Sequence, residues 1–168
     1  EQGGLPMPDR VRSIDLRDRG MAWFASFFGA IRVGNHQAVA FGEARGVPGE
    51  IVTDLAVGDG RVWIAAAEGL GYYQNRSLEF GLAGYRELRP TALAIDERGR
   101  VWGAGPKGAI WFDGSTWHRL AREQGMPTEA LEDVETDARG RVWFLADDRV
   151  LVFTPPPAGV TSATAEGG

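Results

Sequence analysis

The chain has 168 residues, of which 43% are hydrophobic and 24% charged, with a formal net charge of −5 and no cysteine. An acidic balance and scattered Lys and Arg argue against nucleic-acid binding, and the lack of any apolar run near about 18 residues argues against a membrane-spanning helix. Without cysteine there can be no disulfide, thiolate nucleophile or cysteine metal site. The 24 Gly and 9 Pro are spread along the chain, which predicts many tight turns between short strands.

The predicted elements recur along the chain with a period of about forty residues. Residues 1–9 are interpreted as the exit from a preceding unit, and four units follow at 10–46, 47–88, 89–126 and 127–165, the last with a weak outer strand. Each unit carries one tryptophan at Trp23, Trp63, Trp102 or Trp143, separated by 40, 39 and 41 residues. A glycine stands three residues before each tryptophan, at Gly20, Gly60, Gly99 and Gly140. Matching columns in four copies predict one repeated structural unit.

The third unit shows the expected contents of a copy. Residues 91–96, 100–105, 109–113 and 117–121 are short apolar stretches separated by the turn sequences ERG, PKG and GST. None of them has sustained helical spacing, so each is predicted to be a strand. The glycine before each tryptophan suits the positive φ of a tight hairpin turn. The Val-Trp pairs at 62–63, 101–102 and 142–143 place apolar groups on both faces of one strand, which predicts sheets covered on both sides.

The stretches DERGRVWGAGPKGAIWFDGSTWHRL (96–120) and GMPTEALEDVETDARGRVWF (125–144) resemble the two-component-regulator propeller repeat. The resemblance extends over residues 5–153 and is weakest in the first two units, which have Arg17 and Val57 where the turn aspartate belongs. It implies an all-β fold, a β-propeller of four-stranded antiparallel blades, as part of a larger propeller that serves as the extracytoplasmic sensory region of a receptor. A compact four-bladed ring is the alternative.

The resemblance also indicates where a ligand or partner would bind. Propellers usually bind ligands on the face formed by the turns between the second and third strands and by the connections between blades. That face would display Phe27, Phe28, Glu68, Arg89, Lys107, Glu129 and Asp148. Their chemistry differs from copy to copy, which suits an asymmetric binding surface and equally suits unconstrained loops. The opposite face would carry a positive cluster, which either keeps the hairpins soluble or docks an acidic partner: Arg19, Arg61, Arg98, Arg100, Arg139 and Arg141.

No arrangement of residues predicts catalysis, a metal site or a cofactor. The two histidines, His36 and His118, fall near outer strands, and no serine lies in a nucleophile-elbow motif. We therefore expect a non-enzymatic segment for ligand sensing or protein interaction, whose partners are further blades or another protein segment and a small ligand or glycan. Two alternatives stay open: a lyase resembling the virginiamycin B lyases, and a structural interaction module of a large complex.

Overall fold

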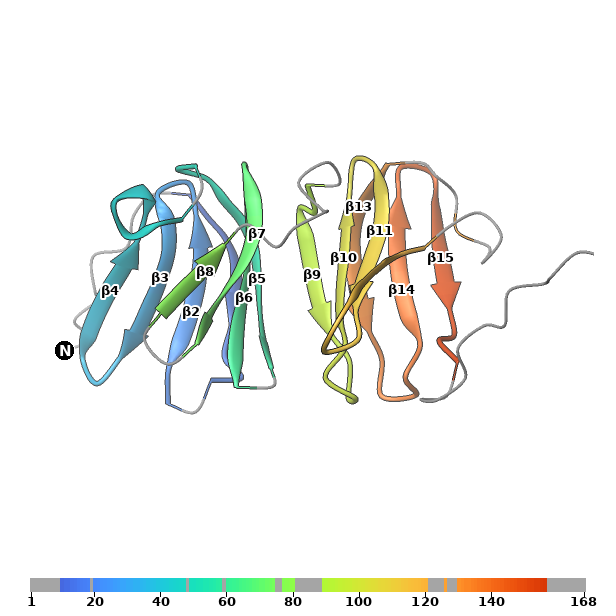
Figure 1. The fold of residues 1–168 in the computed structure, drawn as a ribbon, viewed down its shortest axis with the longest axis horizontal. Helices are drawn as coiled ribbons and strands as arrows, with labels where there is room; N and C mark the ends of the chain where they lie inside the picture. Colours follow the sequence, from blue (N-terminus) through green and yellow to red (C-terminus); the bar gives the residue numbers. More distant parts are fainter. Residues whose placement is uncertain are drawn as a thin grey trace, which may run out of the picture.

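The computed structural model describes residues 10–18, 20–47, 49–58, 60–74, 77–80, 89–120, 126 and 130–156. Within these ranges the chain forms four antiparallel sheets that follow one another in sequence order (Figure 1). Blade 1 contains β1 (Val11–Asp15), β2 (Ala22–Ser26), β3 (Gly29–Gly34) and β4 (Gln37–Phe41), and blade 2 contains β5 (Val52–Gly58), β6 (Arg61–Ala66), β7 (Gly69–Gln74) and β8 (Ser77–Phe80). Blade 3 contains β9 (Ala92–Ile95), β10 (Val101–Gly105), β11 (Gly108–Phe112) and β12 (Trp117–Arg119), and blade 4 contains β13 (Leu131–Thr136), β14 (Val142–Ala146) and β15 (Arg149–Phe153). The all-β prediction is confirmed.

The strands of each blade pair in the order in which they occur, so every blade is a simple meander. The first strands β1, β5, β9 and β13 contact one another in sequence, which makes them the inner strands of an arc. Blade 4 has three described strands; the outer strand expected from residues 159–165 lies outside the described residues. A single turn of 3-10 helix, Glu43–Arg45, connects blade 1 to blade 2.

The core lies between the blades. Trp23 packs in the cluster shared by blades 1 and 2, Trp63 in that of blades 2 and 3, and Trp102 in that of blades 3 and 4, and all three are at most 1% exposed. A buried Trp removes roughly 200 Å² from water, about 5 kcal/mol before entropic costs. Trp117 on the outer strand β12 is also buried, because its ring packs against Trp63 and Phe112.

The repeated phrase Asp-x-x-Gly-Arg-Val-Trp forms a hydrogen-bonded lock between the first two strands of blades 3 and 4. In blade 3, Oδ1 of Asp96 accepts the N–H groups of Arg98 (2.9 Å) and Arg100 (3.0 Å). Its Oδ2 accepts Arg100 Nε at 2.6 Å and Trp102 Nε1 at 3.0 Å, while Gly99 closes the turn with φ 77°. Asp137 of blade 4 makes the same four bonds with Arg139, Arg141 and Trp143.

The first two blades, which resemble the repeat least, depart from this lock. In blade 1, Trp23 Nε1 donates to Asp18 Oδ2 at 2.8 Å, one residue along from the usual position. In blade 2, Val57 stands at the aspartate position and offers no side-chain acceptor. Trp63 Nε1, buried among the described residues, has no hydrogen-bond partner there.

The turn arginines do not form the free positive patch that the sequence suggested. Arg100 and Arg141 are ion-paired with the lock aspartates and lie over the rings of Trp102 and Trp143. Arg61 is likewise placed over Trp63 and Tyr72. Arg98 and Arg139 are exposed, and Arg19 lies outside the described residues. Three of the six arginines predicted for this face, Arg61, Arg100 and Arg141, are therefore in contact with groups of their own blades.

The arc is open. Blades 1 and 4 lie at opposite ends of the row in Figure 1. On the outward face of blade 4, Leu145, Val150 and Val152 are 41%, 58% and 49% exposed, whereas a closed four-bladed ring would bury them. The compact ring considered from the sequence is therefore wrong for this structure.

Candidate binding site

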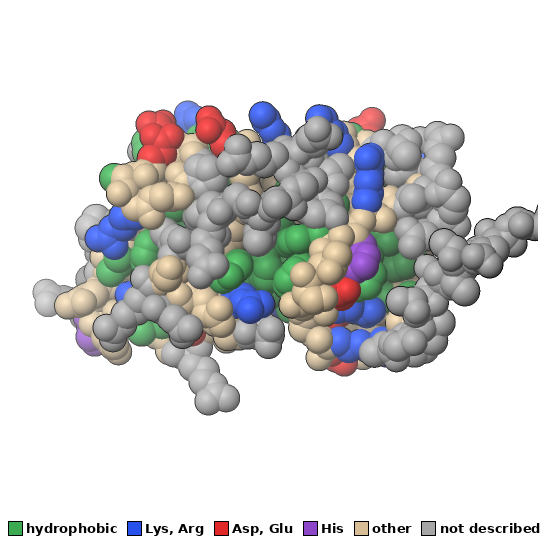
Figure 2. Space-filling view, viewed as in Figure 1, with side chains coloured by type: hydrophobic (Ala, Val, Ile, Leu, Met, Phe, Trp, Pro, Cys, Tyr) green, Lys and Arg blue, Asp and Glu red, His purple; other side chains and the backbone are tan. Residues whose placement is uncertain are grey.

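The predicted loop-face residues lie at one end of the sheets. Phe27 and Phe28 form the β2–β3 turn, and Glu68, Lys107 and Asp148 lie in the β6–β7, β10–β11 and β14–β15 turns. Arg89, which precedes β9, lies at the same end. Its carbonyl oxygen is close to Gly105, the last residue of β10: a Cβ added to Gly105 would lie only 2.7 Å from that oxygen. Glu129 lies outside the described residues. Figure 2 shows acidic and basic side chains along the upper edge of the view, where these turns lie in Figure 1.

The turns present different chemistry from blade to blade. The guanidinium groups of Arg10 and Arg12 lie 5.3 and 5.4 Å from the Phe27 ring centroid, and Phe28 is 59% exposed beside them. In blade 4, Arg149 Nε donates to Asp148 Oδ1 at 2.7 Å, which holds the pKa of this carboxyl below its usual range. The structure brings those of the predicted residues that it describes to one face of the molecule.

The inner strands form a second, continuous polar surface. A cavity of about 360 Å³ is lined by β1, β5, β9 and β13 together. Its ionisable lining residues are Arg12, Asp15, Arg17, Asp54, Glu132, Asp133 and Glu135. At the end that carries the lock turns, a wider cavity of about 650 Å³ is lined by Arg17 and by residues of the blade 3 and blade 4 turns. Arg17 is thus common to both cavities.

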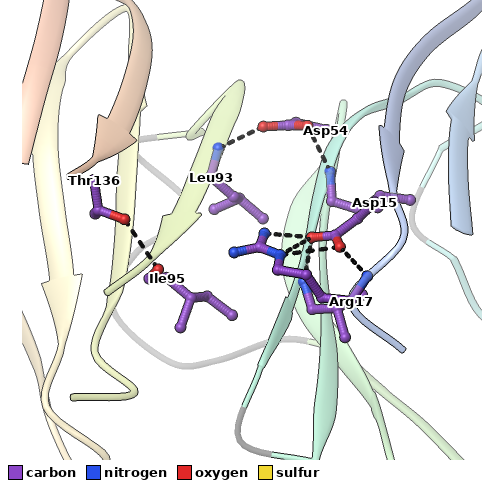
Figure 3. A network of polar contacts seen from close by, with 8 residues as sticks. Asp15, Arg17, Asp54, Leu93, Ile95 and Thr136 are labelled. Atoms are coloured by element: carbon purple, nitrogen blue, oxygen red, sulfur yellow. Dashed lines mark hydrogen bonds and ion pairs between the residues drawn. The ribbon is translucent and has the colours of Figure 1, made fainter. Parts of the chain in front are cut away.

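Carboxylates of this surface connect neighbouring blades (Figure 3). Asp15 Oδ2 accepts the Val57 N–H at 2.8 Å, and Asp54 Oδ2 accepts the Leu93 N–H at 2.7 Å. The first strand of each blade is an edge strand of its sheet. The N–H groups on its unpaired edge can therefore donate to such acceptors. Between blades 3 and 4, Thr136 Oγ1 donates to the Ile95 carbonyl at 3.1 Å. These bonds fix the inner surface in place.

The carboxylates on this surface have different proton affinities. Burial raises the pKa of Asp54, against the hydrogen bonds from Ser13, Leu93 and Leu55. Burial, and then the nearby charge of Asp133, raises the pKa of Glu135. For Asp15, burial opposes ionisation, but the side-chain and backbone hydrogen bonds from Arg17 prevail and lower the pKa. The surface therefore combines one firmly charged ion pair with acids that protonate more readily.

This inner surface contains none of the residues that the sequence predicted to bind. Those residues lie in turns, whereas the charged residues of the inner surface lie on strands that carry apolar side chains at the same positions in another copy. Glu135 pairs with Trp143 in the register in which Ala94 pairs with Trp102 and Ala56 with Trp63. An acidic residue where two other copies have alanine was the available signal.

Neither histidine reaches the cavities. His36 lies in the β3–β4 turn with φ 60°, and His118 lies on the outer strand β12. His118 Nε2 lies 2.8 Å from Asp113 Oδ2, and this contact, with backbone bonds from Thr116 and Ser115, holds the pKa of Asp113 below its usual range. Within the described ranges, no group of three His, Asp or Glu is gathered as a metal site would require. The same part of the chain contains no helix with the length and apolar character needed to span a bilayer.

No family model matches the chain, and no curated protein sequence is similar to it. Several solved structures share its fold. The extracellular domain of the hybrid two-component system BT3049 from B. thetaiotaomicron superposes with a TM-score of 0.71 at 20% identity, covering 86% of this chain and 22% of that one. A streptogramin B lyase gives 0.69 at 14% identity, covering 90% and 57%. PorZ, a bacterial surface component of the type-IX secretion system of Porphyromonas gingivalis, gives 0.69 at 16% identity, covering 90% and 26%.

At these identities the likeness concerns the fold alone. The chain corresponds to part of each of these larger chains, as expected for some of the blades of a larger propeller. Together with the four meander sheets, it shows that the chain is a four-bladed segment of a β-propeller.

Proposed function

We propose that this segment is a non-catalytic recognition module of the two-component-regulator propeller type, which binds a polar ligand or partner and belongs to an extracytoplasmic sensor. The observation that carries the proposal is the inner-strand cavity, to which all four blades contribute and which has charges of both signs. Because four blades contribute to the site, its geometry depends on how the blades are positioned. A ligand that favours one arrangement of the blades would shift the protein toward that arrangement, and domains in contact with the blades would respond.

Rigidity of the inner surface supports a binding role. Asp15 and Asp54 are held by backbone N–H groups of the following blade, so their geometry is set before a ligand arrives. Preorganised polar groups lose little entropy on binding. Glu132 is exposed at the same cavity and provides the adaptable contact.

The extracytoplasmic placement rests on the structural likeness to extracellular domains of two-component systems. The partners proposed with it are the further blades of a larger propeller, since the chain covers about a fifth of those domains.

A binding screen tests the proposal. The chain is titrated by calorimetry with a panel of neutral, acidic and basic oligosaccharides and short peptides, and each mixture is analysed for products. We expect saturable binding without turnover, weakened about 10-fold or more by Glu132→Lys, because an interfacial charge is reversed. Glu43→Lys, the same change on the exposed connection after blade 1, is the matched control and should leave binding intact. Turnover, or equal loss in both variants, would contradict the proposal.

A lyase is the second candidate, because the fold is shared with a streptogramin B lyase. The positions of His36 and His118 on outer parts of the blades argue against them as acid–base groups facing the channel. Metal-dependent opening of a cyclic lactone that is abolished by His36→Ala or His118→Ala would establish the lyase in place of the recognition module.

A further inference from the structure

The inner strands share an irregularity at the end where they begin. In blades 1, 2 and 4 the pairing register skips one residue, at Arg12, Thr53 and Glu132. A residue skipped in this way forms a β-bulge, which re-aims its side chain. Blade 3 has Thr91 at the same place, because the pair Ala92–Ala104 corresponds to Asp54–Ala65 of blade 2. The four equivalent residues all line the cavity of about 360 Å³ and are called the mouth ring: Arg12, Thr53, Thr91 and Glu132.

The mouth ring has a positive end and a negative end. Arg12 lies on blade 1 and Glu132 on blade 4, and these blades are at opposite ends of the row in Figure 1. Both side chains are exposed, and no ion pair within the described ranges joins either of them to an opposite charge. The two blades between them contribute only the threonine hydroxyls. One ring of equivalent positions therefore presents a cation, two neutral hydrogen-bonding groups and an anion.

The positive end is held in place by an aromatic ring. The guanidinium groups of Arg10 and Arg12 lie 5.3 and 5.4 Å from the centroid of the Phe27 ring, so both cations share one support. Like charges gathered on one ring repel each other, and an anion beside them is attracted to both. Guanidinium groups also bind carboxylates through two parallel hydrogen bonds. Blade 1 thus offers a place for an anionic group.

The opposite end and the middle of the ring have different partners to offer. Glu132 is followed by Asp133, whose Oδ1 accepts the Val134 N–H at 2.9 Å, and Glu135 lines the same cavity. This end attracts a cationic group. Thr53 Oγ1 donates its proton to the Ala65 carbonyl at 3.1 Å, which leaves its oxygen able to accept a hydrogen bond. The middle of the ring therefore suits an uncharged polar group.

We propose that the cavity binds a zwitterionic molecule across the mouth ring, with its anionic group on Arg12 and its cationic group on Glu132. A ligand with a single charge would match one end of the ring and leave the other end without a partner. A molecule with both charges, joined by an uncharged polar segment, matches all four positions. This inference rests on the recognition role proposed above and names the class of ligand.

Glycine peptides provide a matched set of probes. Diglycine to pentaglycine vary the distance between the charges, and each is titrated by calorimetry in four forms: with free ends, with an acetylated amine, with an amidated carboxyl group, and with both ends blocked. At the length that fits the ring, the free peptide should bind about 10-fold more tightly than either singly blocked form, because each block removes one charge-assisted hydrogen bond. The doubly blocked peptide should bind most weakly.

Two variants assign the ends of the ligand. Arg12→Gln should remove the preference for a free carboxyl group and keep the preference for a free amine, and Glu132→Gln should do the reverse. Arg139→Gln, at an exposed position in a lock turn, and Glu43→Gln, on the connection after blade 1, are the matched controls and should keep both preferences. Circular dichroism verifies that each variant is folded. A variant that weakens all four peptide forms equally would show a structural role for that residue and contradict its place in the site.

The outcomes separate this inference from the recognition role itself. Equal binding of the free and blocked peptides at every length would overturn the zwitterion and leave the recognition role intact. The same conclusion follows if no glycine peptide binds while a neutral oligosaccharide of the earlier panel does. Absence of binding in both panels would contradict the recognition role together with this inference.

Discussion

In blades 3 and 4 one carboxylate accepts two backbone N–H groups, an arginine and an indole, and this explains why the same phrase occurs twice in the chain. The lock requires aspartate because one of its oxygens accepts the turn N–H groups while the other accepts the tryptophan indole N–H. Glycine is required at Gly99 and Gly140 because their φ values are positive. Blade 2 folds without the aspartate, so the lock adds stability to a blade that interblade packing already forms.

Replacing Asp96 by alanine should lower the free energy of unfolding by about 2–4 kcal/mol, because buried donors lose a charged acceptor. Chemical denaturation measures the change. A comparison of Trp102→Phe with Trp63→Phe isolates the indole bond, since Trp63 Nε1 has no partner among the described residues. The loss at Trp102 should exceed that at Trp63 by about 1–3 kcal/mol. Equal losses would show that the indole bond contributes nothing.

The Asp15–Arg17 pair should make stability depend on pH in the acid range. The pKa of Asp15 is lower in the folded chain than its usual value of 3.8, so its contribution is present above pH 3.8 and is lost as pH falls through the folded pKa. Asp15→Asn should therefore be less stable than the wild type near pH 7, and the difference should shrink as the pH falls below 3.8. Melting temperatures across this range measure it. A difference that does not change with pH would contradict the ion pair.

At the scale of the strand, the sequence predicted the elements better than it predicted their functional contacts. The tryptophan and glycine columns identify the second strand of each blade and its turns, because hairpin pairing is local. The hydrogen bonds from Val57 to Asp15 and from Leu93 to Asp54 join residues that are 42 and 39 positions apart in the sequence. No local sequence pattern predicts such bonds. Arg100 and Arg141 appeared in the sequence as free surface charge because their partners become visible only when the turn closes.

Equivalent turn glycines should tolerate alanine differently. Gly29 and Gly108 begin the third strands of blades 1 and 3 with φ 109° and 105°. A Cβ on Gly108 has no atom within 4 Å, whereas one on Gly29 would lie 2.1 Å from the Phe41 carbonyl oxygen. Gly108→Ala should cost about 1 kcal/mol of backbone strain, and Gly29→Ala about 3 kcal/mol or more because the backbone must also shift. Thermal denaturation compares them, and equal costs would argue against the close approach.

Across the whole molecule, stability should be distributed by the number of covered faces. Blades 2 and 3 are packed on both sides, while blades 1 and 4 each leave one face open. In a linear array each unit is stabilised by its nearest neighbours. We therefore expect amide hydrogens of β6 and β10 to exchange through the global opening of the chain and those of β14 to exchange through a separate opening of blade 4 alone.

Hydrogen exchange monitored by mass spectrometry measures this directly. Amides of the β10–β11 turn, which lie away from both end faces, serve as the internal reference. Uniform protection of β6, β10 and β14 in the monomer would show that the blades unfold as one cooperative unit. The arc would then owe its stability to interactions that extend beyond neighbouring blades, such as the electrostatic attraction between Arg17 and Glu135 across the inner surface.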